Sequence, residues 1–424
     1  MAKPRIIVVG GGFSGCGAAI TAAKVGAEVM LLERMDMLSG AGLRAGRMNY
    51  NGKMAIAEEA KAMGAGDIFE ALESITLHQG NIVDEEGAYI YDFAKVDPAM
   101  QKIVRDAGVE VRLGCRAADV VKEDGVIKEV ILDGGERLSA AAFIDCSGGT
   151  GGIDICTKYG GGCPMCLFKC PAFGNRVSIA TKAGALEVMF VRPDGTPGGA
   201  TAATQLYKES LSLELRRRLD KEGAFSIQLP KELFRQDNLS ASRSKSQFEH
   251  LNLVDSGLTC KLVGSGRILL DTLRSIPGFE KAVFENPWGG RFSKIGHVSM
   301  TPRDDSQKVK GFQNLFVGGE KSGPGGGGIA EAIVTGITAG NNAVRQAVEA
   351  EPLILPRDCV IGDYSAYTGE MLDTWDAKQM RASVGHGHYF ERMKKLGFYP
   401  ATALSIHKRI QDLGLKGILA KKVI

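Results

Sequence analysis

Three glycines near the start of the chain have the spacing of a loop that binds a dinucleotide. Gly10, Gly12 and Gly15 follow a short apolar run, Arg5 to Val9, and precede small residues typical of a closely packed helix. In such a loop the first glycine permits a tight turn and the second lets the backbone approach a diphosphate. The third glycine lets the helix pack close to the strand. The spacing therefore predicts a strand, a phosphate-binding loop and a helix.

An acidic residue stands at the end of the next predicted strand. Glu33 follows the apolar run Glu28 to Leu32, where a carboxylate would accept hydrogen bonds from the hydroxyls of an adenosine ribose. Phe13 and Ser14 open the intervening helix, whose first N–H groups and positive dipole end favour a phosphate. NAD and FAD share this fingerprint, so these residues alone do not choose between the two cofactors.

A second glycine-rich segment favours FAD. Asn314 to Val317 predicts a buried strand, and Gly319 and Glu320 follow it. This text resembles the C-terminal flavin motif of the glutathione-reductase-like FAD proteins. The resemblance implies that Glu320 lies near the ribityl or diphosphate part of FAD. It also implies that the next helix directs its N-terminus at the flavin ring, which carries negative charge when reduced. The residues that open this helix are Gly327, Gly328 and Ile329.

Two further segments resemble a broad group of FAD-dependent oxidoreductases related to the GidA and heterodisulfide-reductase A flavoproteins. The run Ile144 to Gly151 is similar to their segment Ile-Asp-Ala-Thr-Gly-Asp-Gly, although Cys146, Ser147 and Gly149 depart from it. Leu38 to Gly42 stands where the group has a glycine pair. The resemblance implies FAD as the cofactor and covers about half of the chain. Its segments place Gly40, Gly42, Cys146, Ser147 and Gly148 in the predicted cofactor site, to which we add Arg34 and Ala117. Arg47 lies in the loop after Glu33 and is expected to reach the flavin, with a solvated loop arginine as the alternative.

The cysteines form an unusual cluster. Cys163, Cys166 and Cys170 fall close together, and Cys156 precedes them. Their spacing echoes part of a bacterial ferredoxin run, and Cys156 or Cys260 could supply the fourth thiolate of an iron–sulfur cluster. Because one Cys-x2-Cys step is missing, a redox dithiol, a zinc site and three structural thiols all stay open. The cluster follows the predicted FAD domain, so we expect at least one sulfur near the flavin.

Two residues before the return to the FAD domain are candidates for substrate chemistry. Arg291 and His297 could orient an anionic substrate or move a proton. A purely structural role for both stays open.

The remaining patterns predict an α/β fold with a discontinuous Rossmann-like FAD-binding domain. We assign residues 1–152 and 305–350 to this domain, 153–304 to an inserted mixed α+β substrate domain, and 351–424 to a helical C-terminal region. Within these ranges Pro98 to Ala107 predicts a helix and Arg267 to Leu270 a strand. No second Gly-x-Gly-x-x-Gly follows a strand, so a built-in NAD(P)H domain is not expected.

Composition narrows the function. The chain has 424 residues and a net charge of +3, which does not indicate a nucleic-acid partner. No apolar stretch is long enough to span a membrane, so we expect a cytoplasmic protein with its nine cysteines largely as thiols. We predict an oxidoreductase that moves a hydride or electrons between a small organic substrate and FAD. The alternatives are an iron–sulfur electron-transfer subunit with a redox protein partner and a GidA-like tRNA-modifying flavoprotein. The oligomeric state is not predicted.

Overall fold

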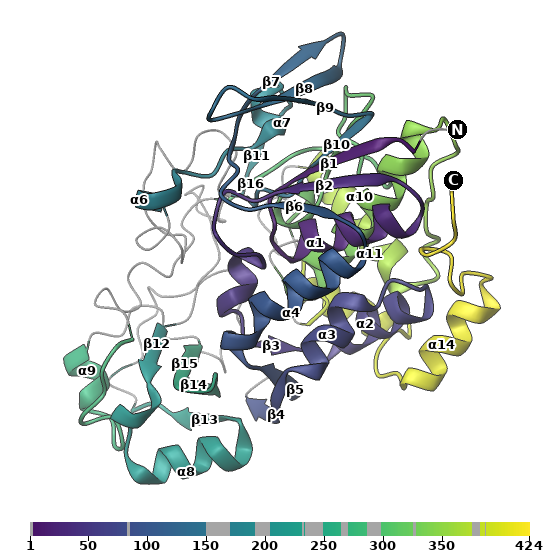
Figure 1. The fold of residues 1–424 in the computed structure, drawn as a ribbon. Helices are drawn as coiled ribbons and strands as arrows, with labels where there is room; N and C mark the ends of the chain where they lie inside the picture. The colour runs from purple at the N-terminus through teal and green to yellow at the C-terminus, as the bar shows by residue number, and fades with distance from the viewer. Residues whose placement is uncertain are drawn as a thin grey trace.

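A five-stranded parallel sheet lies at the centre of the molecule (Figure 1). The computed structural model describes residues 3–82, 85–149, 170–190, 204–230, 233, 249–263, 270–285, 298–324, 328–374, 382–385 and 387–424. The strand order is β17-β10-β1-β2-β6, and every pair is parallel. The strands are β1 (Arg5–Val9), β2 (Glu28–Leu32), β6 (Glu110–Arg112), β10 (Ala142–Asp145) and β17 (Leu315–Val317).

The sheet is assembled from two distant parts of the chain. Strand β17 pairs with β10, with Ile144 opposite Phe316, after an excursion of more than 160 residues. The predicted α/β fold with a Rossmann-like parallel sheet is confirmed. The late strand supports the discontinuous organisation, whereas the three proposed domain boundaries stay predictions.

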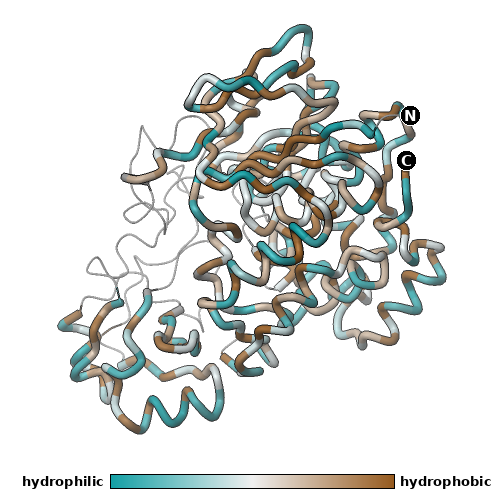
Figure 2. Tube along the Cα trace, in the orientation of Figure 1, coloured by the Kyte–Doolittle hydropathy of each residue, from teal (hydrophilic) through white to brown (hydrophobic). Residues whose placement is uncertain are grey.

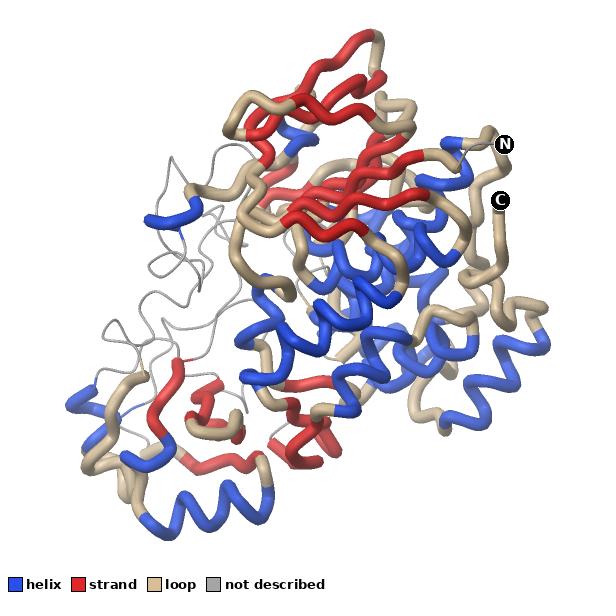
Figure 3. The backbone as a smooth tube through the Cα atoms, viewed as in Figure 1, coloured by secondary structure: helices blue, strands red, loops and turns tan. Residues whose placement is uncertain are grey.

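Both faces of the sheet are covered, as the near-continuous apolar text of its strands requires. Alternate residues of β1 point to opposite faces: Ile6 and Val8 pack among the helices, and Ile7 and Val9 pack under a second sheet. Figure 3 shows most of the long helices gathered on one side of the central strands. The helices that contribute to the larger core include α1 (Phe13–Lys24), α2 (Gly52–Ala62), α3 (Asp67–Ser74), α4 (Phe93–Asp106) and α10 (Ile329–Ala347), and three helices of the C-terminal region join them.

Helices α1 and α10 pack closely because both are rich in glycine. A Cβ at Gly336 would lie 2.0 Å from the carbonyl oxygen of Ser14, and one at Gly340 would lie 2.2 Å from that of Ala18. Side chains at these positions would force the two helices apart. The contact therefore brings the N-termini of both helices to the same edge of the sheet.

Within the described ranges, four smaller antiparallel sheets accompany the central one. The meander β7-β8-β9 covers the face opposite α1 (Figure 1). The sheet β12-β15-β14-β13 carries α8 and α9 and has its own core, which includes Leu206, Phe225 and Phe279. The strands of the four sheets are β7 (Ala117–Glu123), β8 (Val126–Leu132), β9 (Arg137–Ser139); β3 (Arg47–Met48), β5 (Glu85–Tyr91), β4 (Thr76–Ile82); β12 (Thr204–Tyr207), β15 (Thr259–Val263), β14 (His250–Asp255), β13 (Ala224–Gln228); β11 (Val188–Met189) and β16 (Ser299–Met300).

The C-terminal region is helical and packs back on the central part. The Glu59 carboxylate of α2 accepts hydrogen bonds from the N–H groups of Val360 and Ile361, which open α11. Figure 2 shows the apolar residues concentrated in the central strands. In the described part of the chain no helix has the length and apolar character needed to cross a membrane. The remaining helices are α6 (Cys170–Phe173), α7 (Ile179–Lys182), α8 (Leu213–Glu222), α9 (Leu270–Arg274), α11 (Val360–Asp373), α13 (Gly387–Lys395) and α14 (Ala403–Asp412), with short 3-10 turns η1 (Gly40–Arg44), η3 (Lys208–Ser210) and η8 (Gly319–Ser322).

Two element predictions are wrong in detail. Helix α4 begins at Phe93 rather than at Pro98, because the Asp92 side chain accepts a hydrogen bond from the Ala94 N–H and caps the helix earlier. The helix continues through Pro98. Leu270 opens helix α9 instead of ending a strand, and the rest of that predicted strand lies outside the described residues.

Candidate functional site

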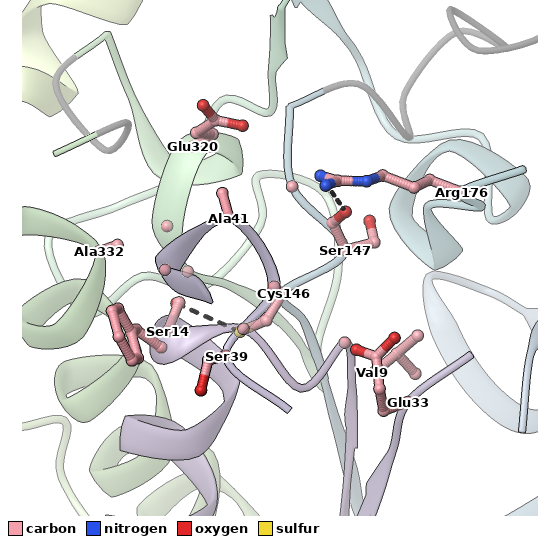
Figure 4. Close-up of a pocket in the computed structure, with 18 of the residues that line it drawn as sticks. Val9, Ser14, Glu33, Ser39, Ala41, Cys146, Ser147, Arg176, Glu320 and Ala332 are labelled. Carbon is pink, nitrogen blue, oxygen red and sulfur yellow. Dashed lines mark hydrogen bonds between the residues drawn. The ribbon is translucent and has the colours of Figure 1, made fainter. Parts of the chain in front are cut away.

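A cavity lies at the carboxyl ends of β1, β2, β10 and β17, where ligands bind in open α/β sheets. It holds about 1010 Å³ of space, part of it open to solvent. Figure 4 shows side chains from both halves of the sheet converging on it. The predicted residues that line it are Gly10, Gly12, Phe13, Ser14, Glu33, Arg34, Gly40, Gly42, Ala117, Cys146, Ser147, Gly148, Gly319, Glu320, Gly328 and Ile329.

The three glycines of the first loop are required for different structural reasons. Gly10 has φ of +101°, and a Cβ there would lie 2.5 Å from the carbonyl oxygen of Cys146. A Cβ at Gly15 would lie 1.8 Å from the carbonyl oxygen of Gly10. At Gly12 no atom lies within 4 Å of an added Cβ, and this residue lines the cavity. The protein's own packing therefore requires Gly10 and Gly15, whereas Gly12 keeps the cavity open.

Two helix N-termini meet at the cavity. Gly12 is the N-cap of α1 and Gly328 the N-cap of α10, and neither helix has a side-chain cap. Uncapped N–H groups together with the positive dipole end attract phosphate or another anion. At α10 the Glu331 carboxylate lies so close that a Cβ at Gly328 would meet its Oε2 at 2.1 Å. Helix α1 therefore offers the more open of the two anion sites.

Glu33 is buried at the end of β2, with 5% of its surface exposed. Its Oε2 accepts a hydrogen bond of 2.6 Å from the Gly11 N–H, and its Oε1 accepts one of 2.8 Å from the Met35 N–H. Each carboxylate oxygen keeps a further lone pair for a ligand hydroxyl. Glu33 thus fixes the glycine loop and lines the cavity, an arrangement suited to a ribose.

Replacement of Glu33 by alanine should weaken FAD affinity by about ten- to a hundredfold, the equivalent of ~1.5–3 kcal/mol for a charge-assisted hydrogen bond. Titration of the apoprotein with FAD measures this change. Glu28→Ala, which removes an exposed carboxylate at the other end of the same strand, should leave the affinity unchanged. An equal dissociation constant for Glu33→Ala and the wild type would remove Glu33 from the ribose site.

The other predicted acid, Glu320, lies in η8 on the opposite side of the cavity. Its Oε2 accepts a hydrogen bond of 3.1 Å from the Gly149 N–H, which joins the end of β17 to the end of β10. The Gly319 N–H donates to Thr335 Oγ1 at 2.9 Å and holds η8 against α10. Glu320 is therefore placed by contacts from three elements.

A loop that follows β2 closes one wall of the cavity. The Ser39 N–H donates to the carbonyl oxygen of Gly11 at 2.7 Å, and a Cβ at Gly42 would lie 2.2 Å from the Phe13 ring. Arg47, predicted to reach the flavin, does not line this cavity. It forms a 2.9 Å ion pair with Glu85, because β3 places it in the sheet with β5.

Another wall of the cavity is formed by the residues that follow β10. Cys146 Sγ lies 3.4 Å from Ser14 Oγ, and burial raises the pKa of the Cys146 thiol to about 12. Cys146 therefore stays a neutral thiol near pH 7 and acts as an apolar lining residue. Asp145 is buried and accepts hydrogen bonds from the N–H and Oγ of Ser147.

Several predictions fall on residues that the structure does not describe. Cys156, Cys163, Cys166, Arg291, His297 and Gly327 lie outside the described residues, and Cys170 opens α6 without a described side chain. In the described ranges no group of three or more His, Cys, Asp or Glu residues could hold a metal ion. The iron–sulfur, dithiol and zinc hypotheses stay predictions.

Sequence reasoning missed part of the cavity. The missed residues share no motif, and two of them, Arg176 and Val177, come from the region assigned to the inserted domain. They include Met35, Ser39, Ala41, Cys115, Arg116, Arg176, Val177 and Ala332. The glycine at Gly42 and the resemblance at Leu38 to Gly42 pointed toward Ser39 and Ala41, but no spacing indicated Arg116 or Arg176.

Two family models match separate parts of the chain. Residues 5–151 match the FAD dependent oxidoreductase family, and residues 256–351 match Glucose inhibited division protein A, or GidA. The first match contains the glycine loop, Glu33 and the end of β10. The second contains β17, Glu320 and α10. The two matched segments thus meet at the cavity.

Curated relatives and solved structures point the same way. The chain is 32% identical over 140 residues to the tRNA uridine 5-carboxymethylaminomethyl modification enzyme MnmG of Borreliella burgdorferi. The aligned stretch covers 30% of this chain and 21% of that protein. The MnmG of Exiguobacterium sibiricum is 34% identical over 104 residues, 24% of this chain and 15% of that one. The matches thus span about a fifth or less of these relatives.

The fold matches over a longer stretch. The structure of Aquifex aeolicus GidA in its form II crystal superposes with a TM-score of 0.66 at 17% identity, covering 97% of this chain and 74% of that one. The form I crystal gives 0.63 at 15% identity. The fold of the chain is therefore similar to that of GidA.

Proposed function

Because the chain carries an FAD-dependent oxidoreductase domain and is related to GidA, we propose that it is a flavoenzyme that carries out a redox step on a base of tRNA. The observation that supports the cofactor is the cavity itself, where the glycine loop and the N-termini of α1 and α10 meet. Bound FAD supplies an isoalloxazine ring that accepts or donates a hydride or electrons.

The residues of the chain fit the parts of FAD in order. Glu33 would hold the adenosine ribose, and Gly12 with the first turn of α1 would receive the diphosphate. Glu320 would lie at the ribityl portion, and Gly328 and Ile329 would border the ring. The apolar share of the lining, including Val9 and Ala332, excludes water and strengthens these polar contacts.

The tRNA part of the proposal is supported by the names of the matched relatives and by the C-terminal region. In that region Lys408, Lys416, Lys421 and Lys422 are exposed. Exposed lysines can neutralise RNA phosphates, with an affinity that falls as salt rises. The net charge of the chain is close to balanced, which predicted no nucleic-acid partner. It therefore produces no extended positive potential that would attract RNA. Contacts would therefore have to be local.

Addition of tRNA to the purified flavoprotein tests this proposal. We expect tRNA to bind, and to bind more weakly at 200 mM salt than at 50 mM salt. We also expect it to perturb the visible flavin spectrum, because the base reaches the ring. Heparin serves as the control polyanion and should leave the spectrum unchanged. If tRNA neither binds nor perturbs the spectrum, the tRNA proposal fails. A small organic substrate, the second candidate that the even charge balance favours, then takes its place.

The cysteine cluster makes a separate prediction. If Cys163, Cys166 and Cys170 include a redox pair, an anaerobic dithionite titration of the oxidised protein should consume one electron pair to reduce the flavin and a second pair to reduce the disulfide to two thiols. Cys166→Ser should lose the second pair and keep its FAD. Stoichiometric iron would instead identify a cluster. Equal electron uptake by both proteins, with no iron, would leave the cysteines with a structural role only.

A further inference from the structure

We infer that residues 174–177 form a strap along the cavity whose Arg176 guanidinium is the counter-charge for the diphosphate of FAD. The inference rests on FAD as the ligand of the cavity and not on the nature of the substrate. Arg176 and Val177 line the cavity. Figure 4 shows the Arg176 side chain reaching over Ser147 toward the centre of the group of lining residues.

The strap is fixed at its first end by two arginines. Arg34 Nη1 donates to the carbonyl oxygen of Gly174 at 2.5 Å. Arg116 Nε donates to the carbonyl oxygen of Asn175 at 2.7 Å, and its Nη2 donates to Asn175 Oδ1 at 2.6 Å. The guanidinium of Arg116 is held in turn by Asp133 at 2.5 Å. Arg34 and Arg116 also line the cavity, and these hydrogen bonds direct Arg34 Nη1 and Arg116 Nε and Nη2 to the strap.

The second end of the strap is fixed to the central sheet. Ser178 Oγ donates to Asp145 Oδ2 at 2.6 Å, and the Ala180 N–H donates to the same oxygen at 3.0 Å. Asp145 is fully buried at the end of β10. The two residues between the fixed ends, Arg176 and Val177, are therefore held against the cavity.

Arg176 itself lies beside the turn that follows β10. Its Nη1 is 3.5 Å from the carbonyl oxygen of Ser147, a long contact for a hydrogen bond. A Cβ at Gly148 would lie 2.5 Å from this Nη1 and 3.7 Å from Glu320 Oε2. The glycine at this position, which has φ of +84°, therefore leaves room for the guanidinium between Ser147 and Glu320.

The charges of the cavity call for a cation at this place. A diphosphate carries two negative charges, whereas the N-terminus of α1 offers only about half a positive charge. The loop from Gly10 to Gly15 contains no Lys or Arg. The predicted acids Glu33 and Glu320 add negative charge to the lining. A guanidinium binds phosphate oxygens through paired hydrogen bonds, so Arg176 supplies both the charge and the donors.

Titration of the full-length apoprotein with FAD, ADP and adenosine tests the inference. Arg176→Gln should weaken FAD and ADP by about ten- to a hundredfold and leave adenosine binding unchanged, since adenosine lacks the diphosphate. Arg176→Lys should recover part of the loss, and the effect of Arg176→Gln should shrink as salt rises. Lys182→Gln is the matched control, because it removes an exposed positive charge on the neighbouring helix α7.

The role of the strap is tested by a double-mutant cycle. Arg116→Gln should also weaken ADP, and the double variant with Arg176→Gln should lose little more than Arg176→Gln alone, because Arg116 acts by positioning Arg176. Loss of FAD affinity with unchanged ADP affinity would place Arg176 at the flavin and overturn the inference. Equal losses for ADP and adenosine, or no loss at all, would also overturn it. A wild-type protein that binds none of the three would instead contradict the FAD assignment.

Discussion

Replacement of Gly12 by valine should abolish FAD binding and leave the fold intact. No atom of the protein lies within 4 Å of a Cβ at this position, and φ of −65° suits any residue. The new side chain would point into open cavity at the N-terminus of α1, where the diphosphate needs the backbone. We expect the affinity for FAD to fall more than about a hundredfold. FAD titration and circular dichroism measure the two effects separately.

The matched control is Gly15→Val. A Cβ there would lie 1.8 Å from the carbonyl oxygen of Gly10, so this change should lower the thermal midpoint strongly and disturb the loop with or without FAD. Retention of a full complement of FAD by the Gly12→Val protein would show that the loop does not hold the diphosphate.

Replacement of Lys53 by methionine should destabilise the protein by about 3–5 kcal/mol. This is the usual cost of leaving one charge of a buried ion pair without its partner. Lys53 Nζ lies 3.0 Å from Glu331 Oε2, and the two side chains are 5% and 0% exposed. The other oxygen of Glu331 accepts hydrogen bonds from Ser383 Oγ at 2.9 Å and the Val384 N–H at 3.0 Å. The pair thus connects α2, the start of α10 and the segment before α13. Denaturant unfolding measures the change.

Two controls separate burial from charge. Lys102→Met removes an exposed lysine paired with Asp106 and should change stability by less than about 1 kcal/mol. The double variant Lys53→Met with Glu331→Leu should recover much of the loss, because it leaves no buried charge. A Lys53→Met protein as stable as Lys102→Met would contradict the account of this pair.

The same pair sets a pH dependence. Burial raises the pKa of Glu331, but Lys53 and the neighbouring N–H groups more than offset it, and the pKa is lowered. Burial lowers the pKa of Lys53, but Glu331 more than offsets it, and the pKa is raised. The contribution of Glu331 is present above its unfolded pKa and lost as pH falls through the folded one. That of Lys53 is present below its unfolded pKa and lost as pH rises through the folded one. The pair should therefore stabilise fully between about pH 5 and 10.

The residues of the glycine loop and Glu33 could be predicted from the sequence because backbone geometry restricts which residues fit at these positions. A Cβ at Gly10 or Gly15 would lie under 3 Å from a backbone oxygen, so only glycine fits there, and Glu33 is held by its place at the end of a strand. Such constraints leave fixed spacings in the sequence. Strand β17 and Glu320 could be found for the same reason, although they come from late in the chain.

The strap and the pairing of β3 with β5 left no comparable spacing pattern in the sequence. Arg176 reaches the cavity because Arg34, Arg116 and Asp145 hold its neighbours, and these three lie 31 to 142 residues away in sequence. Arg47 was misplaced because a loop arginine after Glu33 gave no sign that it would pair across β3 and β5 with Glu85. Contacts of this kind follow from tertiary packing and not from local spacing.

Identification of the cofactor released from the purified protein tests the central claim most directly. The protein should be yellow, and heat should release FAD, identified by chromatography, at about one molecule per chain. Apoprotein should take up FAD in preference to FMN, because in our proposal Glu33 and the N-terminus of α1 hold the adenosine diphosphate half, which FMN lacks. Release of NAD or FMN, or failure of the apoprotein to bind FAD at all, would contradict the assignment of this cavity.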